Sequence, residues 1–307
     1  NAGASLAHMH ARDRNGHQTN DVNVFREINA AVRSKCDIII QNSIAPALGP
    51  NPGTAEDGLQ VLDAGAEMSS IDMGISVVVN RGKTVIIEWT REFLRRAAKM
   101  IMERGLKPEM EIFNDSNMDD ALMLIDEGLF TPPYSFSFVT NMHKVNQGSV
   151  AFQPKRLMGY VDLLPPQSLF STLGVGQAQL PAALQSILLG GNARVGFEDN
   201  IYYSRGGLAK SNAQLVERLV RCGRELGLEV ASPEEARQAQ RDLMAAIGGP
   251  HRLMPGTDYI ASFSPFSSVP TQFLISVEGQ QKWYGQCGLE SLAVSWLFPG
   301  KPIEIQA

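Results

Sequence analysis

The feature that most constrains the fold is a repeated alternation of short β-like runs with longer amphipathic runs. Seven runs have the composition of buried strands: residues 5–11, 37–42, 67–73, 109–113, 134–139, 169–174 and 193–197. Stretches with helical periodicity lie between them, among others residues 91–104, 118–127, 177–189 and 212–226. Strands that alternate with helices form parallel sheets, because each parallel connection needs a crossover. We therefore expect an α/β fold with a parallel sheet.

The number of predicted strands indicates which kind of α/β fold to expect. Seven strand–helix units are one fewer than the eight that close a (β/α)8 TIM barrel. Residues 2–5 are typical of a helix end that runs into a strand. We expect a TIM barrel whose first β/α unit is absent from this sequence, and an open doubly wound sheet is the alternative. Asn117 is expected to cap a helix, and three glycines are expected to end helices: Gly105, Gly128 and Gly227.

The strand–helix alternation stops near residue 240, where the composition changes. Gly248-Gly249-Pro250 is typical of a linker, and residues 272–277 and 281–284 are expected to form a hairpin. We predict three parts: a metal-dependent, N-terminally truncated barrel domain over residues 1–240, a linker over residues 241–249, and a small, incomplete α+β module over residues 250–307.

Charge and cysteine content exclude several classes of partner. The net charge is -5 and there is no basic stripe, which argues against nucleic acid. No apolar run is long enough to cross a bilayer, so we expect no membrane partner. The three cysteines, Cys36, Cys222 and Cys287, lie far apart in the sequence. This spacing argues against a disulfide framework and favours a reducing cytoplasm.

His8 and His10 form a His-x-His pattern within an apolar run. Residues two apart on a strand point to the same side, so both imidazoles face one way. The pair lies at the carboxyl end of its strand, where barrels carry their active sites. Because zinc favours imidazole nitrogen, we interpret the pair as part of a metal site. The alternative is two partly buried histidines that only form hydrogen bonds.

A second polar motif, Arg-Val-Gly-Phe-Glu-Asp-Asn, spans residues 194–200 and is expected to be a short strand that runs into a turn. On such a strand Arg194 and Glu198 share one face, and Glu198 can supply a third metal ligand. Two histidines and one glutamate with an open position are a known catalytic zinc arrangement. Arg194 can hold a substrate carboxylate, while Asp199 orients it or relays a proton. A structural ion pair is the alternative.

Four segments carry a resemblance to a known family: residues 2–13, 194–202, 212–217 and 230–237. Together they resemble the β-keto acid cleavage enzymes over about residues 1–240. The resemblance implies a (β/α)8 barrel that assembles as a homo-oligomer. It also implies a reaction in which a small β-keto acid condenses with acetyl-CoA, and retro-Claisen cleavage then gives acetoacetate and a new acyl-CoA.

The resemblance also assigns roles to individual residues. It places a divalent metal, normally zinc, on His8, His10 and Glu198, although ligand type alone does not exclude manganese or cobalt. Arg194 and Asp199 match the family's catalytic arginine and aspartate. Further matches are a strand-end glutamate and hydroxyl groups around the substrate: Glu111, Ser43, Ser69 and Ser70.

Two departures from the family pattern stand out. The family has a strand and a helix with an active-site glutamate before the His-x-His strand, and this sequence lacks that segment. Residues 77–85 are atypical of the family, so we expect a different substrate.

Residues 283–292 resemble part of the alkylmercury (organomercurial) lyases, in which the cysteine that matches Cys287 attacks mercury. A cysteine at the start of a helix gains thiolate character. Glu290 stands where that family has an aspartate. An inert, buried cysteine is the alternative. Two rival functions therefore remain: an organomercurial lyase-type protein that uses Cys287, and a metal-binding protein without turnover.

Overall fold

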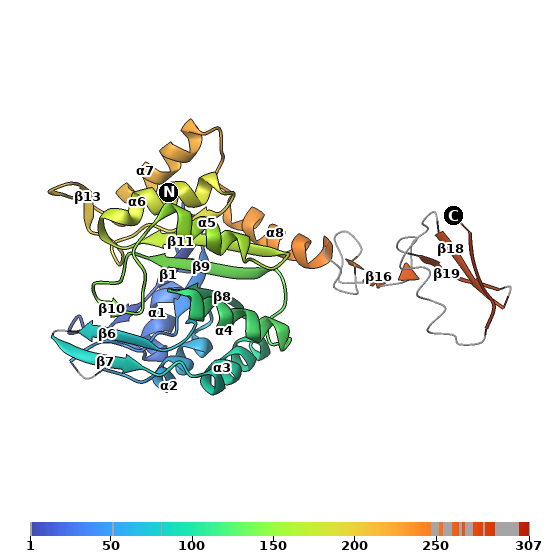
Figure 1. The fold of residues 1–307 in the computed structure, drawn as a ribbon, viewed down its shortest axis with the longest axis horizontal. Helices are drawn as coiled ribbons and strands as arrows, with labels where there is room; N and C mark the ends of the chain where they lie inside the picture. Colours follow the sequence, from blue (N-terminus) through green and yellow to red (C-terminus); the bar gives the residue numbers. More distant parts are fainter. Residues whose placement is uncertain are drawn as a thin grey trace. The chain divides into compact units, whose positions relative to one another are not determined.

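A computed structural model describes residues 2–50, 52–80, 82–246, 252–253, 260–263, 266–267, 273–278, 280–285 and 301–306. The chain divides into two compact units, Asn1–Ala236 and Arg237–Ala307 (Figure 1). No helix among the described residues is long and apolar enough to cross a membrane.

The first unit alternates strands and helices along most of its length. Its elements are β1 (Leu6–Met9), β2 (Ala11–Arg12), β3 (Gln18–Thr19), α1 (Val22–Arg33), β4 (Ile39–Ser43), α2 (Ala55–Gly58), η1 (Leu59–Ala64), β5 (Met68–Asp72), β6 (Ser76–Asn80), β7 (Lys83–Ile87), α3 (Arg91–Glu103), β8 (Lys107–Ile112), α4 (Asp115–Asp126), β9 (Tyr134–Thr140), β10 (Asn146–Gln147), α5 (Pro154–Asp162), β11 (Ser168–Gly174), η2 (Gly176–Ala178), α6 (Gln179–Leu188), β12 (Asn192–Ala193), β13 (Tyr202–Ser204), β14 (Gly207–Leu208) and α7 (Asn212–Glu225). Helix α8 (Pro233–Ala246) crosses the boundary between the units.

Seven parallel strands form the main sheet, in the order β1-β4-β5-β8-β9-β11-β12. This confirms the α/β class and the seven expected strands. The last strand is shorter than predicted, because the chain turns at Gly196, whose carbonyl accepts hydrogen bonds from the amides of Asp199 and Asn200. The prediction that Arg194 and Glu198 share a strand face was therefore wrong, since both residues follow the strand.

The sheet curls into a half-barrel. Strands β1 and β12 form its two opposite edges, yet His10, just after β1, lies 3.0 Å from Glu198, just after β12. Only a strongly curved sheet brings its edges this close, so a flat, doubly wound sheet is excluded. That an eighth β/α unit completes the barrel stays a prediction.

The two faces of the curled sheet differ in chemistry. The convex face packs an apolar core against the helices, with Ile71, Met110 and Phe136 fully buried there. The concave face, here called the lumen, carries a mainly polar set: His8, Gln41, Ser43, Ser70, Asp72, Glu109, Glu111, Ser135 and Ser137. Barrel interiors are usually packed with branched apolar side chains. The polar lumen therefore indicates a binding site.

The helix ends follow local chemistry. The expected stops are confirmed, since Gly105, Gly128 and Gly227 adopt positive φ values just past α3, α4 and α7. The expected cap of α4 was wrong by one turn. Asn114 is the N-cap and accepts from the amide of Asn117, while the Asn117 side chain accepts from the amide of Phe113.

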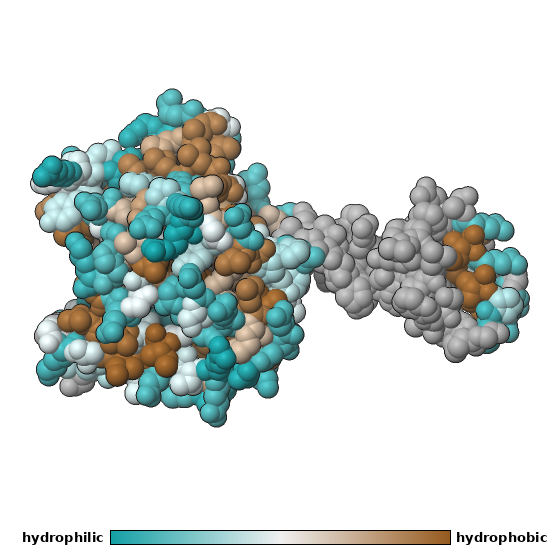
Figure 2. Space-filling view, in the orientation of Figure 1, coloured by the Kyte–Doolittle hydropathy of each residue, from teal (hydrophilic) through white to brown (hydrophobic). Residues whose placement is uncertain are grey.

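The atypical residues 77–85 form most of the β6–β7 hairpin, which pairs with β10 in a small antiparallel sheet. One face packs on the core, so Val78 and Ile87 are buried. The other face stays exposed although it is apolar: Ile75, Val79, Ile86 and Val145. Figure 2 shows apolar surface in the region that Figure 1 assigns to this hairpin.

The described strands of the second unit form an antiparallel sheet in the order β15-β16-β17-β19-β18-β20. Their bounds are Arg252–Leu253, Ile260–Phe263, Phe266–Ser267, Gln280–Gly285, Phe273–Val277 and Ile303–Gln306 in that order. The β18–β19 pair confirms the expected hairpin. Cys287 and Glu290 lie outside the described residues, so the predicted second site and the α+β module stay predictions.

Candidate metal and active site

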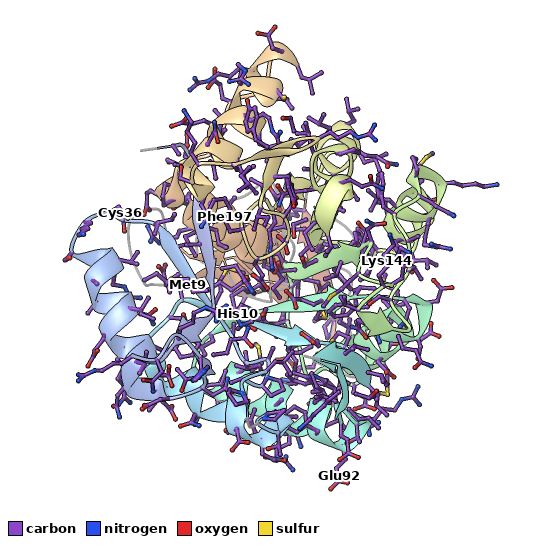
Figure 3. All side chains as sticks on the ribbon, turned by 90° about the vertical axis from the view of Figure 1, so that its left-hand side faces the viewer. Met9, His10, Cys36, Glu92, Lys144 and Phe197 are labelled. Atoms are coloured by element: carbon purple, nitrogen blue, oxygen red, sulfur yellow. The ribbon has the colours of Figure 1, made fainter. Side chains whose placement is uncertain are left out.

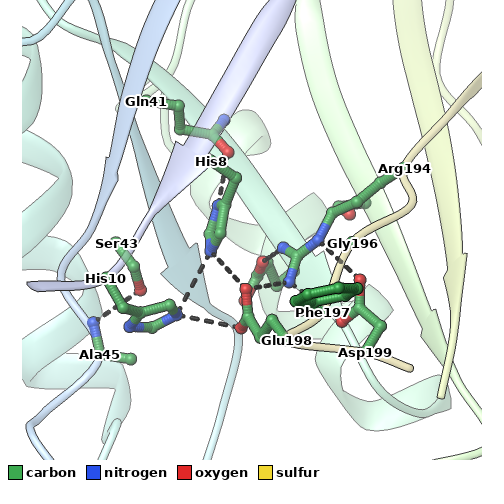
Figure 4. Close-up of polar contacts among 12 residues, drawn as sticks. His8, His10, Gln41, Ser43, Ala45, Arg194, Gly196, Phe197, Glu198 and Asp199 are labelled. Carbon is green, nitrogen blue, oxygen red and sulfur yellow. Dashed lines mark hydrogen bonds and ion pairs between the residues drawn. The ribbon is translucent and has the colours of Figure 1, made fainter. Parts of the chain in front are cut away.

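The two histidines of the His-x-His pattern lie at the carboxyl end of β1, together with a carboxylate from the far edge of the sheet. The Nε2 atoms of His8 and His10 are 3.3 Å apart. Glu198 places Oε1 3.0 Å from His10 Nε2 and Oε2 3.7 Å from His8 Nε2 (Figure 4). The predicted triad is thus brought together from two distant parts of the sequence.

The spacing of these ligand atoms fits a tetrahedral metal. Ligands about 2.0–2.1 Å from zinc form a tetrahedron with edges of about 3.3–3.4 Å. The two histidine nitrogens are 3.3 Å apart, and each faces a different oxygen of Glu198, at 3.0 Å for His10 and 3.7 Å for His8. Two imidazole nitrogens and one carboxylate also match the donor set of a catalytic zinc with an open fourth position. The residues therefore fit the metal that the sequence predicts.

The protonation state of His8 suits a ligand. Its Nδ1 lies 2.7 Å from Oε1 of Gln41, the residue beside it on β4. Because an amide oxygen only accepts, Nδ1 carries the proton and the Nε2 lone pair is free. Burial, assisted by the charge of Arg194, lowers the pKa of His8 to about 3. His8 is therefore neutral at physiological pH, as metal binding requires.

Glu198 is positioned by the backbone of a tightly held loop. The carbonyl of Gly196 accepts from the Gln179 side chain at 2.8 Å, and the amide of Phe197 donates to the Asn212 side chain at 2.7 Å. The carbonyl of Asp199 accepts from the amide of Gly176 at 2.8 Å. These bonds hold the segment on both sides of Glu198, so its carboxylate faces the histidines without being part of a strand.

Arg194 connects three carboxylates at the mouth of the lumen. Nε and Nη2 donate to the two oxygens of Asp199 at 3.2 and 3.1 Å. Nη2 also lies 2.7 Å from Glu198, and Nη1 donates to Glu111 at 3.2 Å. Burial alone would lower the pKa of Arg194, but the surrounding carboxylates raise it above its usual value. Arg194 is a permanent cation beside the candidate metal ligands.

Two further acids, Asp72 and Glu109, also lie in the lumen, although they were not predicted as site residues from the sequence. Asp72 is the register partner of Glu111, and Glu109 lies two residues before Glu111 on the same face of β8. Burial is the main reason that the pKa of Asp72 rises to about 6 and that of Glu109 to about 7. Burial and then Asp72 raise the pKa of Glu111 well above its usual value. The period-two spacing of Glu109 and Glu111 was a signal that both face the lumen.

The three predicted serines occupy different positions. Ser43 ends β4 and accepts from the amide of Ala45 at 3.2 Å. Ser70 shares the lumen face of β5 with Asp72, whereas Ser69 points to the helix side. Among the described residues the buried hydroxyls of Ser69 and Ser70 have no hydrogen-bond partner. Ser43 and Ser70 therefore remain candidates for substrate contact.

The site is accessible on one side of the half-barrel. Figure 3 shows His10 and Phe197 near the middle of this face, with Cys36, Lys144 and Glu92 at its margin. Exposure rises from His8 to Glu198, whose side chains are 7% and 47% exposed. A metal on the triad would therefore have protein behind it and solvent or substrate in front.

Comparison with known proteins identifies the group to which this site belongs. The family model for beta-keto acid cleavage enzymes matches residues 1–240. A 3-keto-5-aminohexanoate cleavage enzyme from Fusobacterium nucleatum is 38% identical over 238 residues, which is 77% of this chain and 83% of that protein. A 3,5-dioxohexanoate:acetyl-CoA acetone transferase from Paraburkholderia graminis is 27% identical over 263 residues, which covers 77% and 82% of the two chains.

Solved structures support the fold. The ternary complex of ObcA with a C4-CoA adduct and oxalate superposes with a TM-score of 0.64 at 18% identity, over 78% of this chain and 64% of that one. The chain thus spans somewhat less than two thirds of ObcA, and the likeness concerns the TIM-barrel-like fold alone. From the family match over residues 1–240 and the 38% identity, the chain belongs to the family of β-keto acid cleavage enzymes.

Proposed function

We propose that this protein transfers CoA from acetyl-CoA to the acyl part of a small β-keto acid and releases acetoacetate, with a divalent metal, zinc by preference, as cofactor. The observation that carries the proposal is the convergence of His8, His10 and Glu198 beside the anchored Arg194. Family membership and the printed names of the relatives support a keto acid and acetyl-CoA as substrates.

The metal has one chemical part in this scheme. When bound, it would act as a Lewis acid that stabilises negative charge developing on the keto acid, an effect worth several kcal/mol. His8, His10 and Glu198 would hold it.

Arg194 would orient the anionic substrate. Its guanidinium is already fixed by Asp199 and Glu111, so little side-chain entropy is lost when a carboxylate binds. Because its pKa is raised, Arg194 keeps its charge and does not accept a proton. Its role is to bind and orient the carboxylate of the keto acid and to stabilise the anion that forms.

The carboxylates are the available proton acceptors. The carbon between the ketone and the carboxylate must lose a proton before it can attack the thioester. Burial raises the pKa of Asp199 above its usual value, which makes this carboxylate a better base. We propose that Asp199 accepts this proton and that Glu111, on the other side of Arg194, is the second acceptor. Ser43 and Ser70 would contact the substrate through their hydroxyl groups.

The bond changes balance without a further reactant. The carbanion carbon forms a bond to the acetyl carbon, and the CoA thiolate leaves. The thiolate then attacks the original ketone carbon, and the bond from that carbon to its neighbour breaks. Acetoacetate and a new acyl-CoA result, and the proton held by the carboxylates returns to the product.

An assay with purified protein tests the proposal. Zinc-loaded protein is mixed with acetyl-CoA and β-keto acids that carry amino, hydroxyl, carboxylate or alkyl substituents, and acyl-CoA products are followed by mass spectrometry. We expect a new acyl-CoA from at least one substrate and none from a His8→Ala/His10→Ala variant. If the protein binds zinc but forms no new acyl-CoA from any substrate, the result would instead favour the alternative of a metal-binding protein without turnover.

The remaining expectations stay predictions. Homo-oligomer formation rests on the family resemblance, and the cytoplasmic setting rests on the cysteine spacing. The lyase hypothesis depends on Cys287, outside the described residues, and phenylmercury cleavage that is lost in Cys287→Ser would support it.

A further inference from the structure

His8 can bind a metal through Nε2 only in one of its two neutral tautomers. The group that faces Nδ1 decides which tautomer forms. Here that group is the Gln41 side chain, whose oxygen lies 2.7 Å from Nδ1. The two residues are register partners on neighbouring strands, and Gln41 is 1% exposed, so solvent cannot substitute for the contact.

An amide can present either of its two ends. With Oε1 toward His8, Gln41 accepts the Nδ1 proton and frees Nε2. With the amide reversed, the NH2 group would donate to Nδ1, and the proton would move to Nε2 and block the metal position. A metal site built on Gln41 therefore needs a second group that discriminates between the two ends.

Glu109 is placed to do so. It lies on the lumen face of β8 and is 7% exposed. Oxygens of Glu109 and Glu111 lie within 4.8 Å of a His8 nitrogen. The Nε2 atom of Gln41 is buried and has no hydrogen-bond partner among the described residues, so this amide nitrogen can donate to a nearby acceptor. Glu109 is an acceptor within its reach, and Gln41 lowers the pKa of Glu109 against a larger effect of burial.

We propose that Glu109 and Gln41 are positioning residues for the metal, in a chain that runs from Glu109 through Gln41 to His8. Glu109 accepts from the Gln41 amide nitrogen, the Gln41 oxygen accepts from His8 Nδ1, and His8 Nε2 faces the metal. The inference rests on the metal site of the proposed function. It adds two residues from separate strands that control the affinity of that site.

A second metal between His8, Glu109 and Glu111 is the competing interpretation of this cluster. Two contacts argue against it. Arg194 donates to Glu111 at 3.2 Å, which would place a guanidinium beside the second ion. The only His8 nitrogen not directed at the triad is bonded to Gln41.

Zinc affinity in four variants and one control variant tests the proposal, with competition against a chelator as the readout. Glu109→Leu removes the acceptor, and loss of such a partner typically weakens metal binding about 10- to 100-fold. Glu109→Gln keeps a carbonyl acceptor and should stay within about threefold of the wild type. Gln41→Glu replaces the amide by a carboxylate whose two ends are alike, so adding Glu109→Leu to it should have no further effect. Ser69→Ala, on the opposite face of β5, is the control.

The tautomer itself provides a second readout that does not depend on turnover. In metal-free protein, ¹⁵N shifts of His8 should report a proton on Nδ1 in the wild type and a mixture of tautomers in Glu109→Leu. An unchanged zinc affinity in Glu109→Leu would overturn the proposal. An equal loss of zinc affinity when Glu109→Leu is added to Gln41→Glu would also overturn it. A drop from two bound zinc ions in the wild type to one in Glu109→Leu would overturn it as well, because it would indicate a second metal site.

Discussion

At the scale of single residues, the site is a balance of charges around one guanidinium. Arg194 contacts Asp199, Glu111 and Glu198, which is one cation for three carboxylates. Asp72 and Glu109 add two more buried acids close by. Unpaired buried charge is costly, so the surplus favours protonation of these acids and would also favour a cation held by His8, His10 and Glu198. Arg194 therefore stabilises the buried carboxylates, and in the proposed reaction it also binds the substrate.

Replacing Arg194 by Lys tests its planar geometry. Lysine keeps the charge but cannot donate to both Asp199 oxygens and to Glu111 at once. We expect kcat/KM to fall about 100-fold or more, with about one zinc still bound per chain. Steady-state kinetics and metal analysis are the measurements, and the exposed Arg205→Lys is the control. A kcat/KM within threefold of the wild type would show that the planar guanidinium of Arg194 is not needed.

The buried Glu109 predicts a dependence of stability on pH. Its pKa rises from 4.5 unfolded to about 7 folded, so the folded state holds the proton more tightly. That stabilisation is complete below pH 4.5 and is lost as pH rises to about 7, a change of about 3 kcal/mol. Metal-free Glu109→Gln should therefore be more stable than the wild type at pH 8 and nearly equal at pH 4.5. Urea unfolding at both pH values checks this, and parallel pH profiles would contradict it.

At the scale of elements, the strands could be predicted and the loop after β12 could not. The runs that became β4, β5 and β9 are buried between the lumen and the helices, so their composition shows in the sequence. The structure brings Glu198 to the two histidines as predicted, but from a loop and not from the strand that was expected to carry it. Its position depends on distant side chains such as Gln179 and Asn212, which no local pattern encodes.

The lumen acids show the same limit. Asp72 is the last residue of β5, in which every residue is buried. Only the pairing of β5 with β8 places Asp72 next to Glu111. Pairing between strands is set by tertiary structure, so the acidic cluster required the fold.

Two glycines in helices provide a matched test of the packing. A Cβ on Gly58, in α2, would overlap the carbonyl oxygen of Ile44, whereas a Cβ on Gly159, in α5, would meet nothing within 4 Å. Gly58→Ala should destabilise the barrel unit by more than about 2 kcal/mol because backbone atoms must move. Gly159→Ala should stabilise it by about 0.5–1 kcal/mol. Thermal unfolding checks both, and equal Tm changes of the same sign would contradict the packing described here.

At the scale of the whole molecule, the described site residues all belong to the first compact unit. The family match ends at residue 240, close to the boundary of that unit. A protein that ends at Gln240 should therefore bind zinc with the same stoichiometry and affinity as the full chain. Metal analysis and chelator competition check this. A loss of more than tenfold in affinity would show that the second unit contributes to the site.

The most direct test of the central claim follows the carbon atoms of acetyl-CoA. Zinc-loaded protein receives acetyl-CoA with both acetyl carbons labelled with ¹³C, together with the β-keto acid that gives most product. Cleavage as proposed places both labelled carbons in acetoacetate and leaves the new acyl-CoA unlabelled, and Arg194→Lys slows both products equally. Label in free acetate, with no acetoacetate formed, would show thioester hydrolysis and contradict the proposed reaction.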